Sequence, residues 1–295
     1  MPQPAVFSAA PQNLTIPPRF CKFIFMPQNA PYRGRIAPTP SGILHAGNIA
    51  TFKTAFERAR ASGGSLVLRI EDIDFERSKP ELVKRCYADL KSAGLSWDEG
   101  DDVGGPFAPY TQSKRLDFYR RALLRLIELG LAYPSSASRS EIKSLARPAV
   151  RRVEDCEVEP IFPTELRPKN FGMPKDVFSR NWRFKVPFGE KIEFFDKIKG
   201  EQCFVSQEDF GDFLVWRKCG APSYELAVVV DDIEMQITEV VRGADLLLST
   251  ARQILLYRAL GAAPPDFAHC PILRGANGEK LSKSRPPKGA PTQSA

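Results

Sequence analysis

Arg35-Ile-Ala-Pro-Thr-Pro-Ser-Gly-Ile-Leu-His45-Ala-Gly-Asn48 is the stretch that decides the fold. Its composition predicts a short apolar strand, a turn rich in Pro and Gly, and an amphipathic helix that begins after His45. Small residues at the first helical turn leave the backbone N–H groups accessible, and the helix dipole is positive there. We therefore expect this end of the helix to bind an anion such as phosphate.

A second strand is predicted directly after this helix. The helix should run to Ala61 and end at Ser62-Gly63-Gly64, and residues 65–70 form an apolar run typical of a buried parallel strand. Glu71 then lies at the carboxyl end of that strand, where open α/β sheets place their ligands. The order strand, helix, strand predicts an α/β fold with a parallel sheet and right-handed crossovers.

The remaining elements are predicted from periodicity and from turn residues. Helices are expected over residues 78–93 and 112–130, and strands near 182–186, 202–205, 213–216, 238–241 and 268–273. Residues 224–230 are the most apolar run, and we interpret them as a strand that ends at Asp231-Asp232. Ser249 is expected to cap a late helix. Residues 133–181 have poor periodicity and predict an irregular insertion.

Composition sets limits on the class of protein. The chain has 295 residues, enough for one large domain with an insertion, and a net charge of +7 that favours a polyanionic partner such as nucleic acid. Moderate basicity is also common in proteins without such a partner. No apolar run reaches transmembrane length, and six cysteines without C-x-x-C spacing predict reduced thiols in a cytoplasmic protein without a membrane partner.

The two ends of the chain are interpreted separately from a catalytic domain over residues 33–284. Residues 1–32 contain no acidic residue and many prolines, so we expect a disordered extension. A basic targeting leader and a true start at Met26 are the alternatives. Residues 285–295 are expected to form a disordered tail.

Candidate nucleotide-binding residues lie at both ends of this domain. His45 and Asn48 share one face of the helix and can contact a triphosphate. Lys280 and Lys283, in Gly278-Glu-Lys280-Leu-Ser-Lys283-Ser284, can neutralise charge on a departing pyrophosphate. A helix-capping histidine and a solvated basic tail are the simpler readings. Two histidines exclude a His-rich metal site and a Ser/His/Asp nucleophile set, and no P-loop is present.

Candidate amino-acid-binding residues lie near predicted strand ends. The guanidiniums of Arg35 and Arg242 can pair with the carboxylates of an acidic amino acid, and Glu71 can pair with its ammonium. Tyr224 can supply a hydroxyl and a ring wall. Each of these residues taken singly is as well explained by an ordinary ion pair or a core aromatic. Gln112 has no such support and is not included.

The stretch from Arg35 to Asn48 resembles the HIGH motif of class I aminoacyl-tRNA synthetases, and the stretch from Gly278 to Ser284 resembles their KMSKS motif. Further stretches resemble the catalytic domain of glutamyl-tRNA synthetases: Leu68-Arg-Ile-Glu71-Asp-Ile-Asp74, Tyr110-Thr-Gln-Ser-Lys-Arg-Leu and Thr238-Glu-Val-Val-Arg242-Gly-Ala-Asp-Leu-Leu. Tyr224-Glu-Leu-Ala-Val-Val-Val-Asp-Asp232 narrows the resemblance to their short paralogues, the glutamyl-Q tRNA(Asp) synthetases.

This resemblance implies a Rossmann-like parallel sheet with helices on both faces and an inserted acceptor-binding-like subdomain. It implies that ATP with Mg²⁺ activates L-glutamate without tRNA, and that the glutamate passes to the queuosine base of tRNA(Asp). The implied glutamate contacts are Arg35, Ala37, Thr39, Glu71, Tyr224 and Arg242. The implied ATP contacts are His45, Gly47, Asn48, Lys280 and Lys283, of which His45 and Lys283 are the catalytic candidates.

The sequence departs from the family pattern in two ways. Where many members carry zinc-binding cysteines, the chain has Tyr133-Pro-Ser135-Ser-Ala137-Ser-Arg139, and the later pair falls at Phe162 and Leu166. We therefore predict no zinc and an insertion held only by packing. The chain also ends 11 residues after Ser284. We accordingly expect no anticodon-binding domain; a truncated glutamyl-tRNA synthetase and a non-catalytic RNA-binding paralogue are the alternatives. Separately, we expect a monomer.

Overall fold

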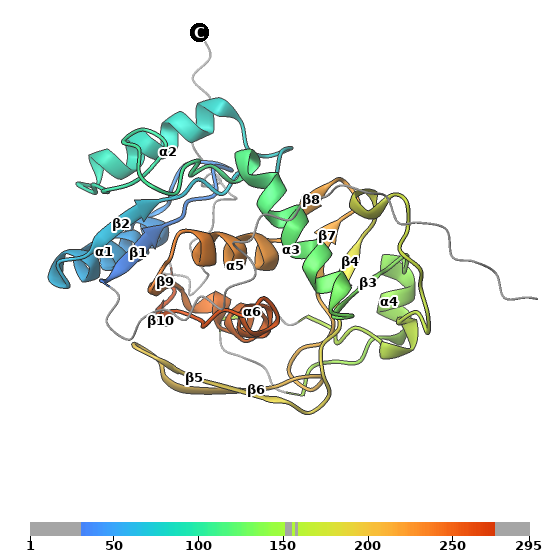
Figure 1. Cartoon of the computed structure of the whole chain (residues 1–295). Coiled ribbons are helices and arrows are strands. Elements are labelled where there is room, and N and C mark those ends of the chain that lie inside the picture. The colour runs from blue at the N-terminus through green and yellow to red at the C-terminus, as the bar shows by residue number, and fades with distance from the viewer. Residues whose placement is uncertain (1–30, 151–154, 157–158, 275–295) are drawn as a thin grey trace, which may run out of the picture.

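A computed structural model of the chain describes residues 31–150, 155–156 and 159–274 (Figure 1). The helices are α1 Ala46–Ala61, α2 Pro80–Ser92, α3 Leu116–Glu128, α4 Arg139–Leu145, α5 Tyr224–Glu234 and α6 Leu247–Ala259. The strands are β1 Arg33–Ile36, β2 Ser65–Leu68, β3 Ala132–Pro134, β4 Trp182–Phe184, β5 Lys191–Asp196, β6 Gly200–Val205, β7 Leu214–Arg217, β8 Ala221–Pro222, β9 Glu239–Gly243 and β10 Asp266–Cys270.

The parallel strands run side by side as predicted. β1 pairs in parallel with β2, and β9 pairs in parallel with β10. The backbone N–H of Thr238 donates to the carbonyl oxygen of Arg33 at 2.9 Å, which places β9 next to β1. A parallel bridge between Phe267 and Asp196 then joins β10 to the β5–β6 hairpin, which runs along the lower side of Figure 1.

Helices cover both faces of these strands, because successive side chains of a strand point to opposite sides. Leu66 and Leu68 pack in a hydrophobic cluster with residues of α1 and α2. Val67, between them, packs in a second cluster with residues of α3, α5 and α6. The predicted Rossmann-like α/β arrangement is therefore confirmed.

A second sheet is built from strands that lie between α3 and α5 in the sequence; it is antiparallel, in the order β3-β4-β7-β8. The ends of the predicted insertion meet here, because Tyr133 of β3 pairs with Arg183 of β4. The described part of the insertion contains α4, no residue of which is buried, and short 3₁₀ turns. Ile161 and Phe162 are buried, so this part of the insertion packs against the sheet.

Three sequence-based assignments are wrong. Residues 224–230 form most of α5 rather than a strand, because Ser223 caps this helix by accepting the N–H of Leu226 and the apolar run is buried on all sides. Ser249 does not cap α6, which begins at Leu247 after a 3₁₀ turn; its hydroxyl donates to Glu225 instead. Tyr32, assigned to the disordered extension, donates its hydroxyl to Glu239 at 2.8 Å.

Two further results concern the ends of the chain and the length of the helices. Residues 1–30 and 275–295, which include the rest of the expected extension and tail, lie outside the described ranges. Among the helices within those ranges, none combines the length and apolar character needed to cross a membrane.

Candidate active site

A cleft of about 350 Å³ opens at the carboxyl ends of β1 and β9, beside the N-termini of α1 and α5. Every site residue predicted from sequence within the described ranges lines it: Arg35, Ala37, Thr39, His45, Gly47, Asn48, Glu71, Tyr224 and Arg242. Lys280 and Lys283 lie outside the described residues. The structure thus brings together side chains that are up to 207 positions apart in the sequence (Arg35 to Arg242, 242 − 35).

His45 caps α1 and lines the cleft. Its Nδ1 accepts the backbone N–H of Asn48 at 3.3 Å, so in the neutral ring the proton resides on Nε2. Gly47 allows this arrangement, since a Cβ there would lie 3.1 Å from the imidazole ring. The side-chain oxygen of Asn48 is buried and has no hydrogen-bond partner in the part of the chain that the structure describes.

Arg35 and Arg242 bring two buried guanidiniums to the other side of the cleft; each residue is 4% exposed. Nη1 of Arg35 donates to the carbonyl oxygen of Val241 at 2.7 Å, while its Nε has no partner among the described residues. Arg242 donates from Nε and Nη2 to side chains behind the cleft, and its Nη1 is likewise unpaired within the described ranges. Burial lowers the pKa of Arg35, with a contribution from the nearby charge of Arg242. A buried cationic donor without a partner is unfavourable, and an anionic ligand in the cleft would satisfy it.

Glu71 supplies the negative charge of the cleft. Its Oε1 accepts from Nη2 of Arg69 at 3.0 Å, and no hydrogen bond to its Oε2 occurs in the described structure. Burial raises the pKa of Glu71, and the charges of Arg69 and Arg35 offset part of that rise. Glu71 is therefore held from behind by one arginine and can face a cationic group in the cleft.

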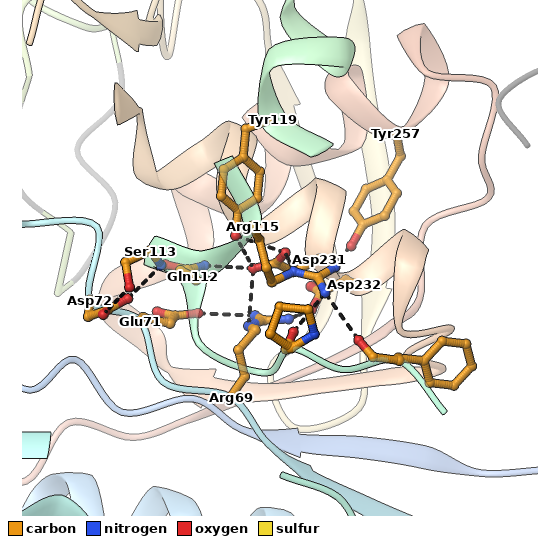
Figure 2. Close-up of polar contacts among 12 residues, drawn as sticks. Arg69, Glu71, Asp72, Gln112, Ser113, Arg115, Tyr119, Asp231, Asp232 and Tyr257 are labelled. Carbon is orange, nitrogen blue, oxygen red and sulfur yellow. Dashed lines mark hydrogen bonds and ion pairs between the residues drawn. The ribbon is translucent and has the colours of Figure 1, made fainter. Parts of the chain in front are cut away.

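A buried ion-pair network supports Glu71, and Figure 2 shows its members converging from the segment after β2, from α3 and the 3₁₀ turn before it, and from α5 and α6. Arg69 donates to Asp232 at 2.6 Å and lies 3.7 Å from Asp231. Asp231 accepts from Arg115 at 2.7 Å and from Gln112 at 2.8 Å. Tyr119 and Tyr257 add hydroxyl donors to the two aspartates.

Gln112, which the sequence analysis set aside, is therefore a buried member of this network. Next to it, the backbone N–H and the hydroxyl of Ser113 both donate to Asp72, as Figure 2 also shows. These contacts attach the segment after Glu71 to the start of α3. The pairing of Arg69 with Glu71 could have been predicted, because residues two positions apart in an extended chain point to the same side. Nothing in the sequence pairs Gln112 with Asp231.

Tyr224 lies in the first turn of α5 and not at a strand end, yet it reaches the same cleft. Burial raises the pKa of its hydroxyl to about 12. Gly243 and Asp245 also line the cleft and were not predicted. A Cβ at Gly243 would lie 2.5 Å from Oδ1 of Asp245, so an alanine there would force the Asp245 side chain to move.

Side-chain contacts hold together the region in which the sequence analysis expected no zinc ligands. Phe162 is buried beneath the guanidinium of Arg183, 4.0 Å from its ring centroid. Tyr133 donates its hydroxyl to the buried Asp212 at 2.5 Å, and Arg167 forms a bidentate pair with the same carboxylate. Within the described ranges, no group of three or more His, Cys, Asp or Glu side chains is arranged to hold a metal ion.

Comparison with known proteins gives consistent matches. The family model described as tRNA synthetases class I (E and Q), catalytic domain, matches residues 32–288. A glutamyl-Q tRNA(Asp) synthetase of Symbiobacterium thermophilum is 47% identical over 85% of this chain and 77% of its own length. A glutamate–tRNA ligase 2 of Rubrobacter xylanophilus is 43% identical over 85% of this chain and 51% of its own length.

Among solved structures, a glutamate tRNA ligase from Elizabethkingia meningosepticum in complex with its amino acid superposes with a TM-score of 0.72. It is 30% identical, and the match covers 86% of this chain and 52% of that one. The family match over most of the sequence agrees with the parallel sheet and with the cleft at its carboxyl end. The chain therefore belongs to the class I tRNA synthetases (E and Q) through their catalytic domain, and it is a ligase.

Proposed function

We propose that this enzyme activates L-glutamate with ATP in the absence of tRNA and transfers the glutamate to the queuosine base of tRNA(Asp). The observation that carries the first step is a pair of buried guanidiniums, those of Arg35 and Arg242, in the same cleft as the carboxylate of Glu71. Each guanidinium has one nitrogen without a hydrogen-bond partner among the described residues. Support for the acceptor comes from the glutamyl-Q tRNA(Asp) synthetases, 42–47% identical, among the relatives.

In this proposal the two arginines bind the carboxylates of glutamate and Glu71 binds its ammonium group. Charge-assisted hydrogen bonds of this kind are shorter and stronger than neutral ones. The Tyr224 hydroxyl and the backbone from Ala37 to Thr39 complete the amino-acid side. The charges of these two arginines and of Glu71 thus match those of an acidic amino acid.

ATP would bind at the N-terminus of α1. His45 offers Nε2–H, Asn48 its side-chain amide, and Gly47 a backbone without a side chain. An oxygen of the glutamate α-carboxylate would bond to the α-phosphorus while the bond to pyrophosphate breaks. Lys280 and Lys283 would stabilise the departing charge, and Mg²⁺ would arrive with the phosphates. Catalysis is then orientation and electrostatic stabilisation without a covalent protein intermediate.

The first step is tested by glutamate-dependent ATP–pyrophosphate exchange without tRNA. Wild-type protein should exchange with glutamate and not with aspartate or glutamine. Arg242→Ala should abolish the exchange while ATP binding is retained, and Arg77→Ala, an exposed arginine paired with Asp74, is the matched control. Unchanged exchange in Arg242→Ala would refute the assignment, and absence of exchange in the wild type would favour a non-catalytic paralogue.

The acceptor is tested separately with labelled glutamate. Transfer should occur to tRNA(Asp) that carries queuosine and not to the same tRNA with guanosine at that position. The glutamate–tRNA ligases among the relatives are 40–43% identical, so charging of tRNA(Glu) is the competing outcome. Label on tRNA(Glu) alone would replace the proposed acceptor while leaving the activation step in place.

A further inference from the structure

Behind Arg242, a buried histidine links this arginine to a carboxylate on another strand. Nε of Arg242 donates to Nε2 of His269 at 3.1 Å, and Nδ1 of His269 lies 2.6 Å from Oδ2 of Asp196. His269 and Asp196 are both 0% exposed. Thr250 accepts from Nη2 of Arg242 at 2.7 Å. Two of the three guanidinium nitrogens are thus held from behind the cleft.

The two oxygens of Asp196 have different partners, and this difference determines which nitrogen of His269 carries the proton. Oδ1 accepts the backbone N–H groups of Ile198, Lys199 and His269 at 3.0, 2.8 and 3.1 Å. Oδ2 is left for the imidazole. Although burial opposes ionisation, the hydrogen bonds from His269 and the backbone lower the pKa of Asp196 to about 2. An ionised Asp196 can only accept, so Nδ1 of His269 carries the proton and Nε2 accepts from Nε of Arg242; Oγ1 of Thr250 also lies 3.0 Å from Nε2.

The charge state of His269 is consistent with this assignment. Burial lowers its pKa to about 4, and the positive charges of Arg242 and Arg35 act in the same direction, while Asp196 opposes them. At neutral pH the ring is therefore uncharged. A charged ring would present an N–H donor to the N–H groups of Arg242 and would repel the guanidinium.

We propose that His269 is a positioning residue: as the neutral Nδ1–H tautomer fixed by Asp196, it holds Arg242 so that Nη1 is left for a carboxylate in the cleft. The identity of that carboxylate rests on the proposed function, because the ligand is there taken to be glutamate. The β5–β6 hairpin, which carries Asp196 and contributes no residue to the lining of the cleft, would then contribute to amino-acid affinity. Without this support the arginine could rotate away from its ligand.

Asp196→Asn tests the proposal with almost no change of shape. The three backbone N–H groups require an oxygen at the Oδ1 position, so the amide NH₂ of the variant must face Nδ1 of His269. The imidazole proton then moves to Nε2, where it opposes the Nε–H of Arg242. Loss of one hydrogen bond to a charged group predicts an increase of about 10- to 100-fold in KM for glutamate, with KM for ATP nearly unchanged.

Two further variants separate positioning from general loss of stability. Asp266→Asn changes an exposed carboxylate on the neighbouring strand β10, paired with Lys197 at 3.2 Å, and should leave both KM values unchanged. His269→Gln can place its amide oxygen near the former Nε2 and should recover part of the glutamate affinity that His269→Ala loses. An equal rise in both KM values, or no recovery by glutamine, would overturn the proposal.

Nuclear magnetic resonance gives a readout without any substrate. The chain contains two histidines, so ¹⁵N-histidine labelling resolves both rings, and His45→Asn assigns them. His269 should show the Nδ1–H tautomer without titration from about pH 5 to 8, and Asp196→Asn should convert it to the Nε2–H tautomer. An Nε2–H tautomer in the wild type would refute the inference. If no amino acid supports exchange in the wild type, the proposed function fails, and the tautomer still decides the inference.

Discussion

Replacing Arg69 with methionine should destabilise the protein strongly while keeping a side chain of similar volume. Arg69 is 0% exposed and contacts three carboxylates: Asp232 at 2.6 Å, Glu71 at 3.0 Å and Asp231 at 3.7 Å. Asp231 keeps Arg115 as a partner in the variant, whereas Glu71 and Asp232 lose their ion pair with Arg69. Removing one member of a buried pair costs about 3–5 kcal/mol, because the other charge remains buried.

The loss should depend on pH in a defined direction. Burial already raises the pKa of Glu71 in the folded protein, and the charge of Arg69 lowers it, so removing Arg69 should raise this pKa further. A carboxyl with a raised folded pKa favours the folded state when protonated and disfavours it as the pH rises through that pKa. The difference between Arg69→Met and the wild type should therefore be full at about pH 8 and smaller at about pH 5.

Urea unfolding followed by circular dichroism measures this difference. With a slope of about 3 kcal/mol per molar urea, the expected loss lowers the midpoint by about 1 M or more at the higher pH. The matched control is Arg77→Met, since Arg77 is exposed and its pair with Asp74 should contribute less than about 1 kcal/mol. An unchanged midpoint, or a difference that grows at low pH, would refute the reasoning.

Three other changes test separate parts of the structure. Gly47→Ala brings a Cβ to 3.1 Å from the imidazole ring of His45 and should lower the exchange rate about tenfold, whereas Gly172→Ala, with no atom within 4 Å, should not. Tyr133→Phe leaves a buried carboxylate without its hydroxyl donor and should cost about 1–2 kcal/mol in thermal unfolding; an unchanged melting temperature would contradict this. Since burial lowers the pKa of His269 from 6.5 to about 4, the unfolded chain takes up its proton first as the pH falls. The free energy of unfolding should therefore fall by about 3 kcal/mol as the pH is lowered from 6.5 to about 4. In urea titrations at a series of pH values, His269→Gln should show a smaller decrease.

Much of the cleft could be predicted because its residues lie in short segments whose local pattern is informative. The turn before α1 places His45, Gly47 and Asn48 within one helical turn, and their relation depends only on helix geometry. Arg35 and Glu71 lie at or just beyond the ends of β1 and β2, which pair in register. Parallel pairing then brings these two side chains to the same edge of the sheet.

The helix α5 shows where local pattern was insufficient. A run of valines surrounded by apolar residues is compatible with a buried strand and with a buried helix, since both are hydrophobic on every side. Ser223 and the packing of α5 against α3 and α6 decide for the helix. The assignment of Tyr224 to the cleft was nevertheless correct, because the first turn of α5 lies beside the cleft.

By itself, the sequence determined the order of strands and helices around the first turn, the start of α1 and the residue types of the cleft. These features depend on neighbours within about four positions, where backbone geometry relates residues directly. Only the tertiary structure decided which charges are paired. Arg69 meets Asp232, 163 positions away, and His269 meets Asp196, 73 positions away, through packing of separate elements. The stretch that begins at Arg35 locates the cleft in the sequence. Buried partners far along the chain hold the side chain of Arg242 and, through Arg69, that of Glu71.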